Sequence, residues 1–223
     1  MPQPPTTLIL FPLKEEAAQT RRHLAGRPEV SIRLIGIGSR KAERAIREAL
    51  AETKPEQVFT CGFAGGLNPE LAIGQVIFAT ESPGLRIALL KAGARPAVFL
   101  QTPRVVVTAV EKLRLRQTTG ADAVEMESGV IRRLCREHGI PSATVRVISD
   151  RADEDLPVDF NALMRSDGRL DFPRLVLTLL GSPGRIGAMI RLGRNTAAAA
   201  RRLALVLEQV LPAGDPLRHV ASP

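Results

Sequence analysis

The sequence has few of the residues on which nucleic-acid-binding and extracellular proteins often depend. It contains no Trp, no Tyr and only 7 Phe in 223 residues, which excludes a surface that stacks single-stranded bases on aromatic rings. Its two cysteines, Cys61 and Cys135, lie far apart and show neither a disulfide framework nor the spacing of a metal site. We therefore expect a cytoplasmic protein with no metal and no nucleic-acid partner.

Long apolar runs and a basic leader are also missing. The opening residues, MPQPPTTLILFPLKEE, have no basic segment before a short apolar run, so they predict a first strand rather than a signal peptide. No segment reaches the length of a membrane-spanning helix. Hydrophobic residues make up 44% of the chain and charged residues 24%, which is typical of a globular protein, and the length favours one domain over residues 1–223.

Positive charge is the main bias of the composition. The formal net charge is +8, which indicates either a solvated arginine-rich surface or contact with an anionic partner. The stretch from Arg174 to Leu207 has six arginines and no acid, with Ile186, Met189 and Ile190 at helical spacing between them. It predicts a basic helical C-terminal part from about residue 171. That part either packs on the domain with a basic outer face or contacts anionic lipid.

Apolar strands alternate with helical segments along the chain. This alternation predicts an α/β fold with a largely parallel sheet, whose site lies at the carboxyl ends of strands. The predicted strands are 6–12, 30–38, 56–67, 73–80, 97–101, 104–108, 122–126 and 142–150. The predicted helices are 14–24, 40–54, 109–117, 127–139 and those from 159 onward, with a break at 182–184, while residues 81–103 are poorly patterned.

Acidic residues stand at three of the predicted strand ends. Glu16 lies just beyond the first strand, Glu127 follows the strand DAVEM, and Asp150 ends the strand SATVRVISD. Glu127 heads the inward-facing stripe of its helix, where it either stabilises the helix N-terminus or serves a site. Glu125 precedes it on the strand, with Met126 on the opposite face.

An arginine lies inside the apolar strand that Asp150 ends. Alternation places Arg146, Ile148 and Asp150 on one face, and a buried arginine needs an anion beside it. Arg146 either forms a structural ion pair with Asp150 or another acid, or orients an acid of a site. Asp150 has the position of a general acid. The glycine-rich GFAGGL at 62–67 allows close approach of a ligand or is merely a turn, and it lacks the spacing of the dinucleotide and P-loop motifs.

Four stretches together resemble the nucleoside phosphorylase and nucleosidase superfamily. They are GIG at 36–38, CGFAGGLNPELAIGQVIFAT at 61–80, AVEMES at 123–128 and VRVISD at 145–150. The pattern is most similar to the methylthioadenosine/adenosylhomocysteine nucleosidase type. The resemblance implies a three-layer αβα fold around a mixed, largely parallel twisted sheet. It also implies cleavage of the N-glycosidic bond of an adenine nucleoside, without a cofactor, by a homo-oligomer.

The resemblance also implies a role for each matching residue. Glu16 and Arg146 match the pair that activates the attacking water, and Asp150 matches the general acid that protonates N7 of the purine. Met126 and Glu127 match the ribose-binding pair, with Glu127 accepting hydrogen bonds from the 2′ and 3′ hydroxyls. The positions that match the base and the 5′ pocket are Ala64, Gly65, Ser149 and Phe160.

The sequence departs from the phosphorylases of this superfamily at the phosphate pocket. Phe63 stands where they carry Ser or Thr, and the preceding strand EQVFTC has no arginine. This favours water as the nucleophile. Phosphate remains the alternative co-substrate, with Arg40 at a helix start as its candidate ligand, although a solvated helix charge is the better explanation of Arg40.

Two further features resemble the hopanoid-associated phosphorylase branch, whose substrate is thought to be adenosylhopane. The segment between IGQVIFAT and AVEMES is shorter than in typical nucleosidases, and the C-terminal part is basic and apolar. We therefore expect adenine release from adenosylhopane, with peripheral contact to an anionic membrane. The alternatives are a methylthioadenosine/adenosylhomocysteine nucleosidase, a phosphate-dependent phosphorylase and a nucleoside-binding protein. Whether residues 81–120 close over a ligand is left open by the sequence.

Overall fold

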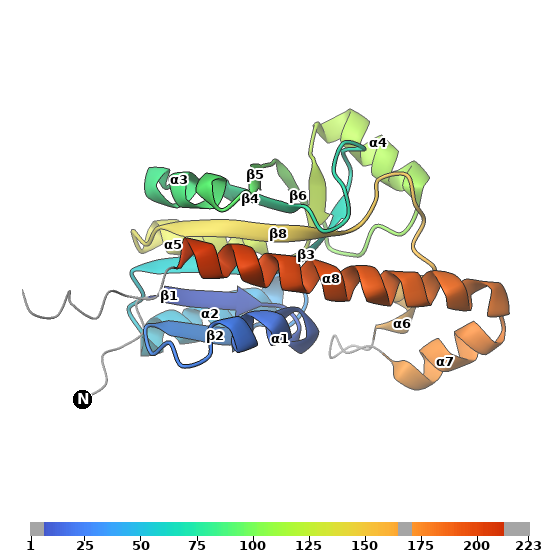
Figure 1. The fold of residues 1–223 in the computed structure, drawn as a ribbon, viewed down its shortest axis with the longest axis horizontal. Coiled ribbons are helices and arrows are strands. Elements are labelled where there is room, and N and C mark those ends of the chain that lie inside the picture. Colours follow the sequence, from blue (N-terminus) through green and yellow to red (C-terminus); the bar gives the residue numbers. More distant parts are fainter. Residues whose placement is uncertain (1–6, 165–170, 212–223) are drawn as a thin grey trace, which may run out of the picture.

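An eight-stranded sheet runs through the part of the chain that this computed structural model describes, residues 7–164 and 171–211 (Figure 1). The neighbouring strands follow the order β2-β1-β3-β8-β4-β5, and β7 pairs with β3 and β6. The strands are β1 (Thr7–Phe11), β2 (Val30–Leu34), β3 (Gln57–Gly66), β4 (Val76–Thr80), β5 (Arg95–Pro96), β6 (Phe99–Gln101), β7 (Ala123–Glu125) and β8 (Ser142–Asp150).

Most strand pairs are parallel, and two are not. Strands β2, β1, β3 and β8 run in one direction, whereas β4 is antiparallel to β8 and β7 is antiparallel to β3. The central strand β8 is buried from its second residue to its last, as expected of a strand that is covered on both faces. The predicted mixed, largely parallel sheet is thereby confirmed.

Helices cover both faces of the sheet and make the fold three-layered. Helices α1, α3 and α8 enclose one hydrophobic cluster with the sheet, and α2 and α5 enclose another on the opposite face. Figure 1 shows α8 lying along the sheet, with its first half and α7 extending beyond the end of β8. The helices are α1 (Lys14–His23), α2 (Ser39–Glu52), α3 (Pro83–Lys91), α4 (Ala109–Thr119), α5 (Ser128–Glu137), α6 (Phe160–Leu163), α7 (Phe172–Leu180) and α8 (Ile186–Val210).

One predicted strand, 104–108, is wrong. Its backbone is bonded to the segments that follow β8 instead of to a neighbouring strand. The Val105 N–H donates to Asn161 Oδ1 at 2.8 Å, Asn161 Nδ2 donates to the Val105 carbonyl at 2.9 Å, and the Leu156 N–H donates to the Val107 carbonyl at 2.8 Å. These β-branched residues are therefore held by a side-chain amide and a loop, which local β propensity does not reveal.

One strand boundary and one helix also differ from the prediction. The second strand ends at Leu34 instead of residue 38, because Gly36 and Gly38 take positive φ angles of 74° and 93° and turn the chain into α2. The poorly patterned residues 81–103 contain α3, which Ser82 caps by accepting the Leu85 N–H at 3.5 Å and which has Pro83 in its first turn.

The C-terminal part is helical, as predicted. Helices α7 and α8 are separated by a short 3-10 helix at Pro183–Arg185, which confirms the predicted break. Among the described residues, no helix has both the length and the hydropathy needed to cross a bilayer. Residues 1–6, 165–170 and 212–223 lie outside the described residues, and they include the start of the chain, where the sequence argues against a signal peptide. The assignment of 1–223 to one domain stays a prediction.

Candidate active site

The acids that the sequence singles out do lie beyond the carboxyl ends of the central strands. Glu16 is in the first turn of α1, directly after β1, and Asp150 is the last residue of β8. Glu127 stands between β7 and α5, beside the end of β3. All three side chains are buried, each residue being 8% exposed or less.

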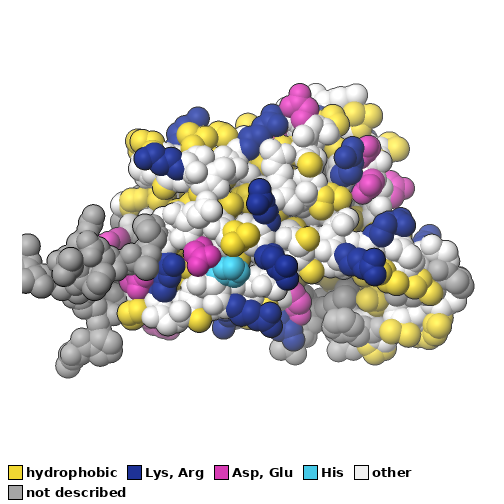
Figure 2. Space-filling model, in the orientation of Figure 1, with side chains coloured by type: hydrophobic (Ala, Val, Ile, Leu, Met, Phe, Trp, Pro, Cys, Tyr) yellow, Lys and Arg dark blue, Asp and Glu magenta, His cyan; other side chains and the backbone are white. Residues whose placement is uncertain are grey.

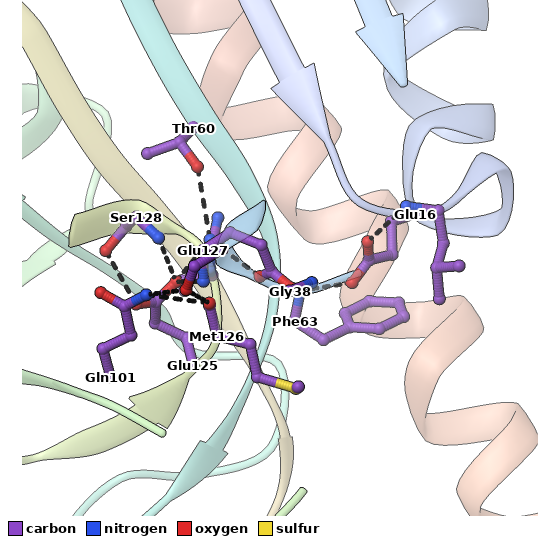
Figure 3. Close-up of polar contacts among 12 residues, drawn as sticks. Glu16, Gly38, Thr60, Phe63, Gln101, Glu125, Met126, Glu127 and Ser128 are labelled. Atoms are coloured by element: carbon purple, nitrogen blue, oxygen red, sulfur yellow. Dashed lines mark hydrogen bonds and ion pairs between the residues drawn. The ribbon is translucent and has the colours of Figure 1, made fainter. Parts of the chain in front are cut away.

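Glu16 is a buried carboxyl group held against β3. Its Oε1 accepts the Phe63 N–H at 2.8 Å, and its Oε2 accepts the Leu13 N–H at 3.1 Å (Figure 3). Burial raises the pKa of Glu16 to about 7, although the Phe63 N–H and the charge of Arg146 oppose the rise. A Cβ at Gly62 would lie 3.0 Å from Glu16 Oε1, so glycine at this position gives the carboxylate its place against the strand.

Arg146 is a fully buried guanidinium surrounded by carboxylates. Its Nη2 lies 2.8 Å from Glu125 Oε2 and 3.8 Å from Glu127 Oε2, and it donates to Thr60 Oγ1 at 3.3 Å. Burial opposes the charged form, but the charges of Glu125, Glu127 and Glu16 together raise the pKa of Arg146. Its Nε and Nη1 atoms are buried and have no hydrogen-bond partner in the described residues. The charge of Arg146 is therefore enclosed in the protein and acts on the acids around it.

Glu125 is a site residue whose part the sequence did not reveal. It accepts the N–H groups of Glu127 and Ser128 at 3.0 and 2.8 Å and the Ser128 hydroxyl at 2.9 Å, so it caps α5. Burial alone would raise the pKa of Glu125, but Arg146 and these donors outweigh it and hold that pKa below its usual value. The Arg146 ion pair therefore involves Glu125 and not Asp150.

Glu127 is left with a different environment. Its Oε1 accepts the Gly38 N–H at 2.9 Å, and it makes no side-chain cap of α5. Burial raises the pKa of Glu127, with Arg146 opposing. The Met126 carbonyl beside it accepts from Ser39 Oγ at 3.2 Å and from Gln101 Nε2 at 3.0 Å, which fixes this turn between the start of α2 and β6 (Figure 3). A carboxylate held in this way keeps lone pairs free for the hydroxyls of a sugar.

Asp150 has a buried cation beside it that no sequence argument identified. Lys112 Nζ, from α4, lies 2.6 Å from Asp150 Oδ2, and the Ser149 hydroxyl donates to Asp150 Oδ1 at 2.6 Å. The strand register between β3 and β8 pairs Ala64 with Ile148 and Gly65 with Asp150, so it skips Ser149. This bulge ends the alternation on which the sequence argument placed Arg146 and Asp150 on one face, and it separates the two groups.

Of the remaining predicted site residues, Ala64 and Gly65 adjoin Asp150, whereas Phe160 and Arg40 lie on other elements. Ala64 and Gly65 lie on β3, and a Cβ at Gly65 would be 3.3 Å from Asp150 Oδ2, so they adjoin the general-acid candidate. Phe160 is in α6, half-buried against a cluster of Val158, Leu163 and Leu175. Arg40 is exposed in the first turn of α2.

Two carboxyl groups, those of Glu16 and Asp150, thus lie against the glycines of β3. No group of three or more His, Cys, Asp or Glu side chains in the described ranges is placed to hold a metal ion. The chemistry available to these residues is acid–base catalysis assisted by a buried positive charge.

Comparison with known proteins identifies the family. A family model described as the phosphorylase superfamily matches residues 10–99 and 82–181, a span that includes every candidate site residue. The chain belongs to the phosphorylase superfamily. The resemblance carried by the four sequence stretches is thereby confirmed at the level of the superfamily. Membership of its hopanoid-associated branch stays a prediction.

Members of this superfamily from several bacteria are similar to the chain. The 5′-methylthioadenosine/S-adenosylhomocysteine nucleosidase of Shewanella oneidensis is 27% identical over 180 residues, which are 65% of this chain and 76% of that protein. The nucleosidase of the same name from Glaesserella parasuis is 26% identical over 170 residues, covering 61% of this chain and 74% of that protein.

Solved structures share the fold. The futalosine hydrolase of Helicobacter pylori superposes with a TM-score of 0.70 at 16% identity, covering 92% of this chain and 97% of that one. The 5′-methylthioadenosine/S-adenosylhomocysteine nucleosidase of Neisseria meningitidis, in complex with methylthio-immucillin-A, gives 0.70 at 17% identity with the same coverage. The three-layer α/β fold is therefore confirmed, and the individual residue roles stay predictions.

The raised pKa of Glu16 makes stability depend on pH. The ordinary pKa is 4.5 and the folded value about 7, so between them the folded chain holds a proton that the unfolded chain has released. The stability from this proton is fully present below pH 4.5 and is lost as pH rises through 7. From pH 5 to pH 8 we expect wild type to lose up to about 3 kcal/mol relative to Glu16→Gln. Denaturant unfolding of both proteins across this range measures the difference, and identical pH dependence would contradict the assignment.

Proposed function

We propose that this enzyme cleaves the N-glycosidic bond of an adenine nucleoside with water as the nucleophile and releases adenine. Its membership of the phosphorylase superfamily and its similarity to purine nucleosidases support cleavage at a purine nucleoside bond. The observation that carries the proposal is a carboxyl group of pKa about 7, Glu16, lying near the buried Arg146, with the acid Asp150 at the end of the same strand as Arg146.

Each step of the reaction has a group to perform it. Water attacks C1′ of the ribose while the bond from C1′ to N9 breaks, and the water gives a proton to Glu16. A base with a pKa near 7 is suited to this at neutral pH. Arg146 assists through its charge, which acts on Glu16 from within the protein. Glu127 accepts the ribose hydroxyls and stabilises the positive charge that develops on the sugar. Asp150 delivers a proton to N7, so that adenine leaves as a neutral molecule.

The surroundings of Glu16 support water over phosphate. The Phe63 N–H, on the part of β3 that would have to face a phosphate, is already bonded to Glu16 Oε1 at 2.8 Å. Arg40, the alternative phosphate ligand, is exposed on α2. A multiply charged anion beside Glu16, Glu125 and Glu127 would meet repulsion that a neutral water does not.

The surface beyond the sheet supports adenosylhopane as the substrate. The α7–α8 surface, which we define by the side chains exposed on α7, the 3-10 helix and the first half of α8, lies past the carboxyl end of β8, where Asp150 is (Figure 1). On the face drawn in Figure 2, hydrophobic and basic side chains stand next to one another over this region. Its apolar members, each at least 41% exposed, are Val176, Leu177, Leu180, Ile186 and Ile190. Its basic members include Arg174, Arg185, Arg191 and Arg194.

Exposed aliphatic groups surrounded by arginines fit the interface of an anionic bilayer. The apolar side chains enter the acyl region while the arginines pair with anionic headgroups. An enzyme held there by its α7–α8 surface would keep its site close to a substrate that resides in the lipid. The cytoplasmic location, the absence of a cofactor and a homo-oligomeric state are carried as predictions of the sequence.

Adenine release from three nucleosides tests the function. The substrates are adenosylhopane, methylthioadenosine and adenosine, each with and without phosphate. We expect release from adenosylhopane that does not require phosphate. Asp150→Asn should retain nucleoside binding and lose roughly 10²–10⁴-fold in rate, because the leaving purine is no longer protonated.

Two outcomes would change this assignment. Rapid release from methylthioadenosine alone would make the enzyme an ordinary methylthioadenosine/adenosylhomocysteine nucleosidase, and strict dependence on phosphate would make it a phosphorylase. Binding without release from any of the three nucleosides would indicate a nucleoside-binding protein. Undiminished turnover in Asp150→Asn would remove that residue from the mechanism.

Vesicle sedimentation tests the membrane contact. At low salt we expect the protein to sediment with vesicles of phosphatidylglycerol and not with vesicles of phosphatidylcholine. The double variant Leu177→Ser/Leu180→Ser should bind at least about 100-fold more weakly, since each buried leucine contributes about 1.5–3 kcal/mol. Ile87→Ser/Leu90→Ser on α3, which removes side chains that are 54% and 45% exposed elsewhere, is the matched control and should bind as wild type does. Equal weakening in both double variants, or no binding by wild type, would contradict the proposal.

A further inference from the structure

Lys112 is a fully buried charge in a helix that exposes two of its apolar side chains. Its side chain has no exposed surface, while its neighbours on α4, Val110 and Leu113, are 80% and 55% exposed. Burial of an ammonium group costs several kcal/mol unless other groups compensate it. The hydrophobic effect alone does not explain a helix that buries Lys112 and exposes Val110 and Leu113. The position of Lys112 therefore calls for another explanation.

Three acceptors surround the Lys112 nitrogen and define its protonation state. Nζ lies 2.6 Å from Asp150 Oδ2, 2.7 Å from the Arg151 carbonyl and 2.8 Å from the Glu154 carbonyl. An ammonium group has three N–H donors for three acceptors, whereas a neutral amine has two. The three acceptors around Nζ therefore match the three N–H donors of an ammonium group, and Asp150 Oδ2 accepts one of them as a carboxylate oxygen does.

A carboxylate at Asp150 raises a question for the reaction. The proposed function requires this residue to give a proton to N7 of the purine, and a carboxylate has none to give. The proton nearest to Asp150 Oδ2 is on Lys112 Nζ, 2.6 Å away. The Ser149 hydroxyl, the other group hydrogen-bonded to this carboxylate, is a much weaker acid than an ammonium ion.

We propose that Lys112 is the positioning residue that holds Asp150 and supplies the proton which Asp150 transfers to the purine. This inference rests on the proposed function. As the bond from C1′ to N9 breaks, the N–H bond on Lys112 Nζ passes its proton to Asp150 Oδ2. The O–H bond formed there passes a proton on to N7, and Lys112 is left as a neutral amine.

The pair regains its proton through Asp150. The Lys112 side chain is fully enclosed, whereas that of Asp150 is 11% exposed, so water reaches the carboxylate and not the amine. A proton taken up by Asp150 from water returns to Lys112 and restores the ion pair. The same three contacts tie α4 to the end of β8 and the loop after it, so α4 takes part in the site through Lys112.

The variant Lys112→Met tests the proposal, since methionine fills a similar volume without a proton to donate. In wild type Asp150 receives its proton through the hydrogen bond from the enclosed Lys112 Nζ and not from solvent. In the variant Asp150 has to take its proton directly from solvent, which becomes rarer as pH rises. We expect the ratio of wild-type to variant kcat for adenine release to increase by up to tenfold per pH unit across this range and to reach roughly 10²–10³ at pH 8. The KM should stay within about threefold.

Controls separate this role from a purely structural one. Arg114→Met removes an exposed cation from the same helix and should leave kcat and its pH profile unchanged. A ratio that is constant with pH would overturn the proton-supply role and leave the proposed function intact. Absence of adenine release by wild type would overturn both. If Lys112→Met does not fold, Lys112→Gln, which keeps two hydrogen-bond donors on a group that does not give up a proton, carries the same test.

Discussion

The burial of one guanidinium among carboxylates is the constraint on which the rest of the site depends. Arg146 has no exposed surface and lies on the central strand β8, where no water compensates its charge. Glu125 compensates it at 2.8 Å, and Glu127 lies at 3.8 Å. With Arg146 already paired to Glu125, burial dominates at Glu16 and raises its pKa to about 7. The acid that we propose as the base therefore differs from the acid that holds the arginine, and their environments separate their pKa values.

The backbone is arranged around these charges. Glycines on β3 allow carboxylates to lie directly against the strand, because a Cβ at Gly62 or Gly65 would lie 3.0 Å from Glu16 Oε1 or 3.3 Å from Asp150 Oδ2. The bulge between β3 and β8 then directs Asp150 toward Lys112 and away from Arg146. Two separate ion pairs result, one beside the proposed water and one beside the proposed leaving group. Such a separation lets a single site hold a base and a proton donor at the same pH.

The sequence predicted most of the strands, though not the two-residue β5, and most of the acids near the site. Buried parallel strands leave continuous apolar runs, and the acids that follow them stand out. It did not predict Lys112, since α4 exposes Val110 and Leu113 and so gives no amphipathic pattern that marks the lysine as buried. The contact with Asp150 joins residues 38 positions apart, which no local pattern encodes. The strand at 104–108 was wrong for the same reason, because an amide from Asn161 takes the place of a partner strand.

The central claim is that this network of buried charges directs water to C1′ of an adenine nucleoside. The most direct measurement is hydrolysis in ¹⁸O-labelled water containing phosphate, followed by mass analysis of the sugar product. The account predicts one ¹⁸O atom on the anomeric carbon, adenine in equal amount and no sugar phosphate. An unlabelled sugar 1-phosphate as the main product would show that phosphate is the nucleophile and would contradict the roles given to Glu16 and Arg146.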